Sequence, residues 1–250
     1  MRFKLPRLPH GWRAFFGEVG IIVLGVLIAL GAQQLVEDWQ WRRQAEQAKH
    51  AIEAELMLQE VDGYERLAVQ PCLRGQIRKL YGGLKRHQGH WKATPMVVRQ
   101  DHHPGAAQRV VDAAYRAPGR LWFDEAWETA RSSGALNHLP DRLVADYAEA
   151  YNRGTRIFQV GESEAAAASS LSALAVDGAI DNDSRVRLIG ALAQVDRDNS
   201  YIEITVREEL KKLSTVLRDI PRRQREEAIA ARIRNQNELR GGCVLQLRLQ

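Results

Sequence analysis

The sequence predicts an all-α protein in which an N-terminal transmembrane helix continues into a stalk and a helical bundle. Three observations support this: an uncharged apolar run at residues 19–36, apolar residues at every third or fourth position over much of the remaining chain, and no β-hairpin turn signal. Of the 250 residues, 45% are hydrophobic and 27% charged, with both signs interspersed. This composition suits one water-facing folded domain behind an anchor, and neither a polytopic membrane protein nor a disordered chain.

The anchor is the most specific feature of the sequence. As a helix, residues 19–36 are about 27 Å long, close to the hydrocarbon thickness of a bilayer. Trp12 precedes the run, and Trp39 and Trp41 follow it. Tryptophan rings favour the headgroup zone, so these three residues should mark the two membrane interfaces.

Small residues within the run predict a packing face. Gly25, Ala29 and Ala32 fall on one side of the helix at the spacing that lets two membrane helices approach closely. The expected partners are the lipid bilayer and either a second copy of this chain or another inner-membrane protein.

The basic tail predicts the orientation. Arg2, Lys4, Arg7 and Arg13 stand before the apolar run, where no acid occurs except at the entrance of the run itself. Because cationic flanks of a membrane helix tend to stay on the cytoplasmic side, we expect a bacterial inner-membrane protein with its N-terminus in the cytoplasm. Its parts would be a cytoplasmic tail (1–17), a transmembrane helix (18–36), a helical stalk (37–69) and a periplasmic α-helical domain (70–250). The alternative is a cleaved export signal, because Ala29 and Gly31 imitate a cleavage site, although the apolar run continues beyond them.

The anchor also resembles a known family. Phe16-Gly17-Glu18, the apolar stretch 21–30 and Trp39 are similar to the N-terminal region of an uncharacterised family of bacterial single-pass inner-membrane proteins, and segments 126–130 and 133–136 are similar to a second part of it. The resemblance implies an inner-membrane anchor and a helical domain beyond the membrane, and it implies no activity.

Helix signals continue along the chain. The stalk helix should persist to about Leu67, a second helix should begin at Pro71 and end near Lys85, and short helices should carry Tyr115 and then Trp122 and Trp127. In the second half, helices are expected from Pro140 through the alanine-rich run to Ala175, from Asp183 to Pro221, and from Pro221 to about Gly241, with a heptad-like stripe in the middle one. Residues 244–249 alternate like a strand.

Two cysteines predict a disulfide. Cys72 and Cys243 are the only ones in the chain, and an even count in an oxidising compartment favours a bridge over two unpaired thiols. Closing so long a loop would stabilise the fold by roughly 4 to 5 kcal/mol in the chain-entropy model. The bridge would tie the C-terminal tail to the second helix.

Two further groups are weaker candidate sites. His87, His90, His102 and His103 lie close together in the sequence and could bind a divalent metal, but they follow no recognised ligand spacing, so a solvated loop is the preferred interpretation. Aromatic residues could line a ligand pocket beside nearby acids, but they more often form a bundle core. This second group comprises Trp122, Phe123, Trp127, Tyr147 and Tyr151, with Asp124, Glu125 and Glu128.

No motif fixes a reaction. The sequence contains no nucleophile elbow, zinc-protease helix, dinucleotide fingerprint or P-loop, so we expect neither an enzyme nor a cofactor. The net charge of +5 raises nucleic acid as a partner, but acids are interspersed nearly everywhere, so we expect none. The favoured hypothesis is a membrane-anchored helical interaction or accessory module. The alternative is a periplasmic ligand-binding sensor, which would act through a membrane partner because the expected tail 1–17 is too short to hold a signalling domain.

Overall fold

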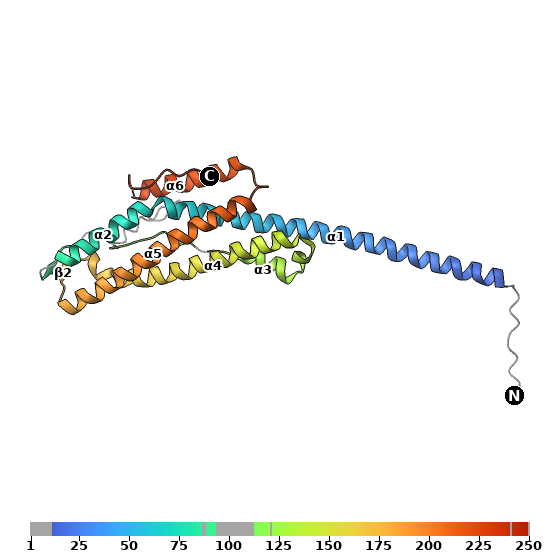
Figure 1. The fold of residues 1–250 in the computed structure, drawn as a ribbon, viewed down its shortest axis with the longest axis horizontal. Coiled ribbons are helices and arrows are strands. Elements are labelled where there is room, and N and C mark those ends of the chain that lie inside the picture. The colour runs from blue at the N-terminus through green and yellow to red at the C-terminus, as the bar shows by residue number, and fades with distance from the viewer. Residues whose placement is uncertain (1–11, 87–88, 94–112, 121, 241, 250) are drawn as a thin grey trace, which may run out of the picture.

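A computed structural model describes residues 12–86, 89–93, 113–120, 122–240 and 242–249, with the side chains of 12–15 and 18 left aside. These parts are mostly helical, and Figure 1 shows one long helix projecting from an elongated bundle. The elements follow in chain order. They are α1 (Trp12–Ala68), α2 (Gln70–Arg86), β1 (His90–Trp91), α3 (Glu125–Ser132), the 3-10 helix η1 (Ala135–His138), α4 (Asp141–Ser169), the 3-10 helix η2 (Ser172–Ala175), β2 (Gly178–Ala179), α5 (Asn182–Val216) and α6 (Arg222–Arg240).

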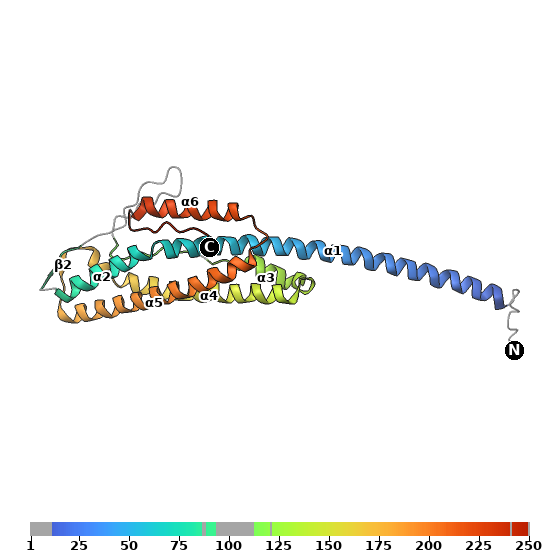
Figure 2. The same cartoon turned by 45° about the horizontal axis from the view of Figure 1, so that its top comes forward.

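Helix α1 contains the long apolar segment and also forms the axis of the bundle. Its apolar first part has no cover, whereas Ala45, Ile52 and Leu56 are buried at the three- to four-residue spacing of a packed helix face. The expected stalk (37–69) is therefore helical, but only its first turns are free. From Ala45 onward the stalk is a core element, because α3 to α6 cover its apolar positions, as Figure 2 shows from a second direction.

The chain bends at the end of α1 and goes on as α2. Val69 is the single residue between the two helices, and its N–H still donates to the carbonyl of Glu65 at 3.1 Å. Pro71 lacks an N–H, so it cannot continue the α1 hydrogen-bond ladder. The expected helix start at Pro71 is thus correct to within one residue.

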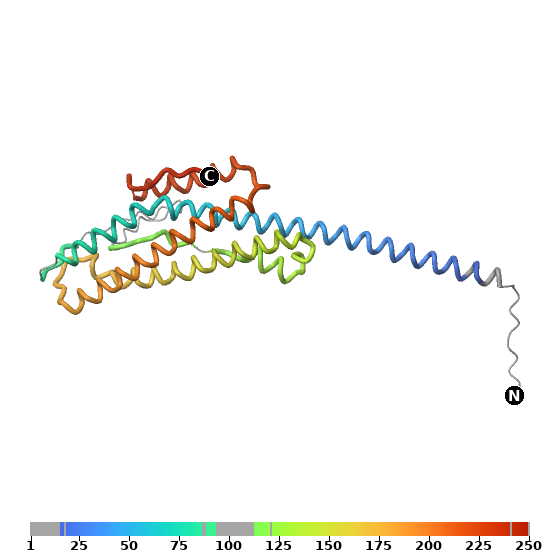
Figure 3. Tube along the Cα trace, in the orientation of Figure 1, coloured from blue at the N-terminus to red at the C-terminus, as the bar shows by residue number. Residues whose placement is uncertain are grey.

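Helices α4 and α5 run antiparallel along the bundle, and the tube in Figure 3 shows α5 lying beside α1 and α2 as well. Helix α4 begins after Pro140 as expected but ends at Ser169, and η2 replaces its predicted extension to Ala175. Asp181 caps α5 by accepting a hydrogen bond from the Ser184 N–H at 2.6 Å. Helix α5 ends at Val216, before the expected stop at Pro221. Helix α6 starts at Arg222, directly after Pro221, as predicted.

Three local predictions were wrong. Residues 113–120 contain no helix, so Tyr115 lies in irregular chain; the earlier part of the helix expected there lies outside the described residues. Trp122 and Phe123 precede α3 rather than belonging to it. The tail 244–249 forms no strand; its Leu245 N–H donates to the Ala68 carbonyl at 2.8 Å. Short alternating patterns specify structure weakly unless a partner edge is available.

A two-stranded antiparallel pair, which the sequence did not predict, closes the end of the bundle farthest from the apolar segment of α1. Trp91 of β1 faces Gly178 of β2, and its indole N–H donates to the Leu174 carbonyl at 3.0 Å. The ring lies over Gly83, where a Cβ would come within 2.8 Å of it. Glycine at this position lets the large ring pack against the α2 backbone.

Candidate functional site

The apolar part of α1 has the properties of a membrane span. From Val19 onward the helix contains an 18-residue window with a mean hydropathy of 2.3, and the described residues bury none of that window. Gly25, within the expected packing face with Ala29 and Ala32, has nothing within 4 Å of a Cβ built on it. The helix is long and apolar enough to cross a bilayer, and the described residues leave the expected packing face uncovered.

The two described tryptophans of the expected membrane interface, Trp39 and Trp41, have different surroundings. Trp39 is 59% exposed and carries the Arg43 guanidinium 5.6 Å from its ring centre, as suits a headgroup position. Trp41 instead stacks on His138 at a ring separation of 4.5 Å, which links this part of α1 to η1. The Trp12 side chain lies outside the described part of the structure.

The two cysteines come together as the sequence predicted. The sulfur atoms of Cys72, on α2, and Cys243, after α6, are 2.04 Å apart, and their Cα atoms are 5.2 Å apart. These distances suit a disulfide between residues 171 positions apart. The bridge holds the tail against the α1–α2 junction, where Val244 and Leu249 are buried.

A row of buried ionic groups on α1 was not anticipated. Glu60 pairs through both carboxylate oxygens with Arg225 of α6, and Glu65 pairs likewise with Arg120 at 2.5 Å. Bidentate arginine–carboxylate pairs are directional as well as strong, so they fix α6 and the 113–120 segment on α1. In the sequence this region is only a Glu-rich helix, which is equally typical of a solvated surface.

A third buried pair borders a cavity. Arg66 of α1 donates to Glu164 of α4 at 2.7 Å and to Asn199 of α5 at 3.0 Å, and the Tyr115 hydroxyl donates to the same carboxylate at 2.6 Å. Burial, followed by the Glu164 charge, raises the pKa of Tyr115, so its hydroxyl stays a donor. Four separate segments meet at this network.

The cavity itself has a volume of about 560 Å³ and lies between α1, α4 and the 113–120 segment. Trp122, Ile157 and Phe158 supply apolar lining, and Asp62 lies at its polar side. Burial raises the Asp62 pKa to about 6, although Arg232, with Nη1 at 3.2 Å from its Oδ1, acts in the opposite direction. The size and lining fall within the range of small-molecule pockets.

The aromatic group predicted as a pocket or a core is mostly core. Tyr147 is fully buried and donates to Glu53 at 3.0 Å, while Tyr151 stacks on Trp127 at 5.4 Å. Phe123 is exposed, and Trp122 alone of the set lines the 560 Å³ cavity. The acids Asp124, Glu125 and Glu128 lie at the surface end of α3 and form no part of that cavity.

The histidine cluster is described only at His90, which is exposed in β1. His87, His102 and His103 lie outside the described residues. Among the described residues no group of three His, Cys, Asp or Glu side chains could hold a metal ion.

No protein-family model, no curated protein and no solved structure matches this chain.

Proposed function

We propose that the protein is a single-pass inner-membrane protein that displays a helical interaction module on the periplasmic side. The observation that carries the proposal is the contrast along α1. Its apolar 18-residue window is entirely uncovered, while from Ala45 the same helix is buried at the centre of a bundle. A continuous helix of this kind transmits the position of the anchor rigidly to the folded part.

The proposed orientation rests on charge and on cysteine chemistry. Arg2, Lys4, Arg7 and Arg13 precede the apolar run, which favours a cytoplasmic N-terminus. The close approach of Cys72 and Cys243 favours an oxidising compartment for the bundle, since thiols are kept reduced in the cytosol.

The interaction role is supported by how the buried charges are used. Glu60, Glu65 and Arg66 pair with residues of other elements of the same chain, so they hold the bundle together. A rigid bundle on a helical anchor presents fixed surfaces to a partner in the membrane or beyond it.

A ligand-binding sensor is the second candidate. The 560 Å³ cavity favours it, because Asp62, Arg66 and Trp122 give it two charges and an aromatic wall. Such a sensor would pass its signal to a membrane partner through α1, because this helix both borders the cavity and carries the apolar window.

Topology is tested with two fusions after Gln250. Alkaline phosphatase at this point should be active, and a green fluorescent protein at the same point should stay dark. A bright fluorescent fusion with an inactive phosphatase would contradict the proposal. Intact mass should show residues 1–36 retained; a mature start near Ala32 would support the cleaved-signal alternative.

The interaction role is tested by purification in mild detergent. Proteins recovered with the full chain are compared with those recovered by residues 1–36 fused to an unrelated folded domain. A protein that copurifies only with the full chain supports a module that binds through its bundle. Recovery of the same set by both chains would place any binding in the anchor and contradict the proposal.

A further inference from the structure

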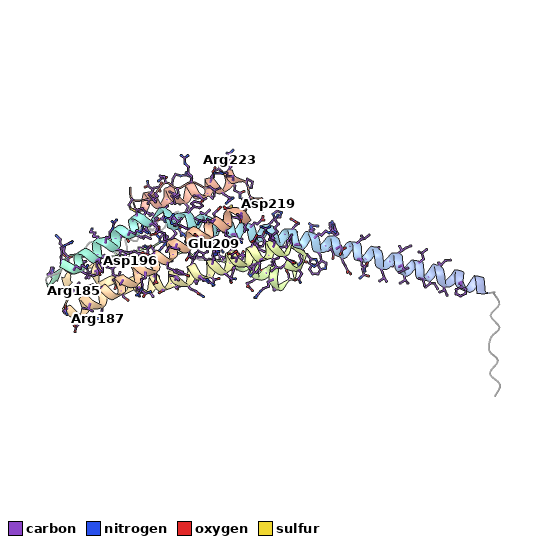
Figure 4. All side chains as sticks on the ribbon, viewed as in Figure 1. Arg185, Arg187, Asp196, Glu209, Asp219 and Arg223 are labelled. Atoms are coloured by element: carbon purple, nitrogen blue, oxygen red, sulfur yellow. A yellow bond between two sulfur atoms is a disulfide. The ribbon has the colours of Figure 1, made fainter. Side chains whose placement is uncertain are left out.

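A groove between α2 and α5 has the features of a binding site. It has a volume of about 880 Å³, and Leu67, Ile77 and Leu192 form apolar parts of its lining. It lies in the half of the bundle away from the free end of α1, near Asp196 in Figure 4. Neither the anchor nor the ionic pairs of α1 use it.

Gln70 lines this groove, and no described residue forms a hydrogen bond with its side-chain amide. The residue is 3% exposed, and neither its Oε1 nor its Nε2 has a hydrogen-bond partner among the described residues. Leaving a buried amide unpaired is costly, and most such groups are bonded. A side-chain amide offers a donor and an acceptor side by side, which is the pattern that pairs with a peptide group. Both amide atoms are shielded from solvent beneath the groove wall, so the Gln70 side chain must turn outward to reach an occupant.

The groove is also electropositive. Four arginines and two acids line it: Arg74, Arg78, Arg197 and Arg207, with Asp196 and Glu203. Glu203 is already neutralised, because Arg74 and Arg207 both bind it, the latter at 2.8 Å. Arg78 and Arg197 are exposed and pair with no carboxylate among the described residues. Each donates one hydrogen bond within its own helix, Arg78 to the Arg74 carbonyl and Arg197 to Gln194, and its remaining N–H groups can bind an anionic group.

The C-terminal tail supplies the last wall. Leu245 lines the groove and is half exposed, and its N–H donates to the Ala68 carbonyl at 2.8 Å. The bond between Cys72 and Cys243 holds this part of the tail in place. The shape of the groove therefore depends on the disulfide.

We propose that the groove binds an extended acidic segment of a partner protein. The Gln70 side chain turns into the groove and pairs with a backbone peptide group of the segment, Arg78 and Arg197 bind its carboxylates, and its apolar side chains cover Leu245. The inference rests on the proposed function as an interaction module and names the chemistry of its partner. Membrane lipid is a poorer occupant: from Val36 to Leu67, α1 rises about 45 Å, so the groove stands well clear of the headgroups.

Binding is tested with the full chain in mild detergent, using a fluorescent peptide of alternating leucine and glutamate. The expected result is saturable binding, measured by anisotropy, with little binding of the same peptide carrying lysine for glutamate. The double variant Arg78→Glu/Arg197→Glu should bind the acidic peptide at least about tenfold more weakly and should prefer the lysine peptide. The matched control Arg187→Glu/Arg223→Glu makes the same charge change outside the groove (Figure 4) and should bind like the native chain.

Gln70→Leu separates binding from folding. It should weaken the acidic peptide about tenfold while raising the thermal midpoint, because it removes an unpaired buried amide. Reduction of the disulfide should also weaken binding. Unchanged binding by Gln70→Leu, or by the Arg78→Glu/Arg197→Glu double variant, would overturn the proposal.

Competitors distinguish the other occupants. Displacement of the peptide by inorganic phosphate or free glutamate at equal concentration would show a general anion site, and displacement by phosphatidylglycerol vesicles would show a lipid site; either overturns the proposal. Because the assay uses purified protein, its outcome is independent of the topology fusions. If the groove does not bind the peptide, the proposed function as an anchored module is unaffected. If the fusions show the opposite topology, the binding measurement remains valid.

Discussion

Glu209 carries a buried carboxyl group in the middle of the bundle. It lies on α5, is 1% exposed, and neither carboxylate oxygen has a hydrogen-bond partner among the described residues (Figure 4). Burial raises its pKa from 4.5 to about 8, and the attraction of Arg153 only partly offsets this. At neutral pH the folded protein therefore keeps a proton here that the unfolded chain releases.

The sign and size of the effect follow from linkage. An acid whose pKa is raised on folding destabilises the fold at any pH above its unfolded value, and the penalty grows until the pH passes the folded value. Each pKa unit corresponds to about 1.36 kcal/mol, so between pH 4.5 and pH 7 the penalty reaches about 3 kcal/mol. Glu209→Gln cannot ionise and should remove that penalty.

The assay is denaturant unfolding of the full chain in mild detergent, followed by circular dichroism from pH 4 to pH 8.5. Glu209→Gln and the native protein should have nearly equal unfolding free energies at pH 4, and the variant should gain about 3 kcal/mol by pH 7. Glu208→Gln is the control, because that neighbouring carboxylate is exposed and pairs with Lys211. A Glu209→Gln effect that does not change with pH would refute the reasoning.

Two further predictions concern packing and charge. Gly83→Ala should destabilise the fold by about 1–3 kcal/mol, because the added Cβ would meet the Trp91 ring at 2.8 Å. Gly75→Ala on the same helix is the control: its Cβ meets nothing within 4 Å, so it should stabilise the fold slightly. Thermal unfolding compares the two variants, and equal effects would contradict the packing argument. Arg225→Met should lower the unfolding free energy by about 3–5 kcal/mol, because it leaves Glu60 charged and buried. Adding Glu60→Gln should recover part of that loss in a double-mutant cycle. Simple additivity of the two changes would show that the ion pair is not coupled.

The sequence alone determined the elements that depend on local physics. An uncharged apolar run predicts a membrane-competent helix because backbone groups in lipid must bond within the helix, and the structure contains that helix. Pro71 and Pro221 placed helix starts correctly because proline suits a first helical turn and stops a preceding helix. With only two cysteines in the chain, Cys72 and Cys243 had no alternative pairing.

Tertiary structure decided what depends on partners distant in the chain. Glu60 and Arg225 are 165 residues apart, and nothing near either one shows that they meet. Buried and solvated charged helices have similar compositions, so the sequence could not show that the stalk is a core element. For the same reason it could not locate the groove between α2 and α5. The two-residue strands and the end of α4 at Ser169 likewise depend on packing, because local propensity over so few residues is too weak to decide them.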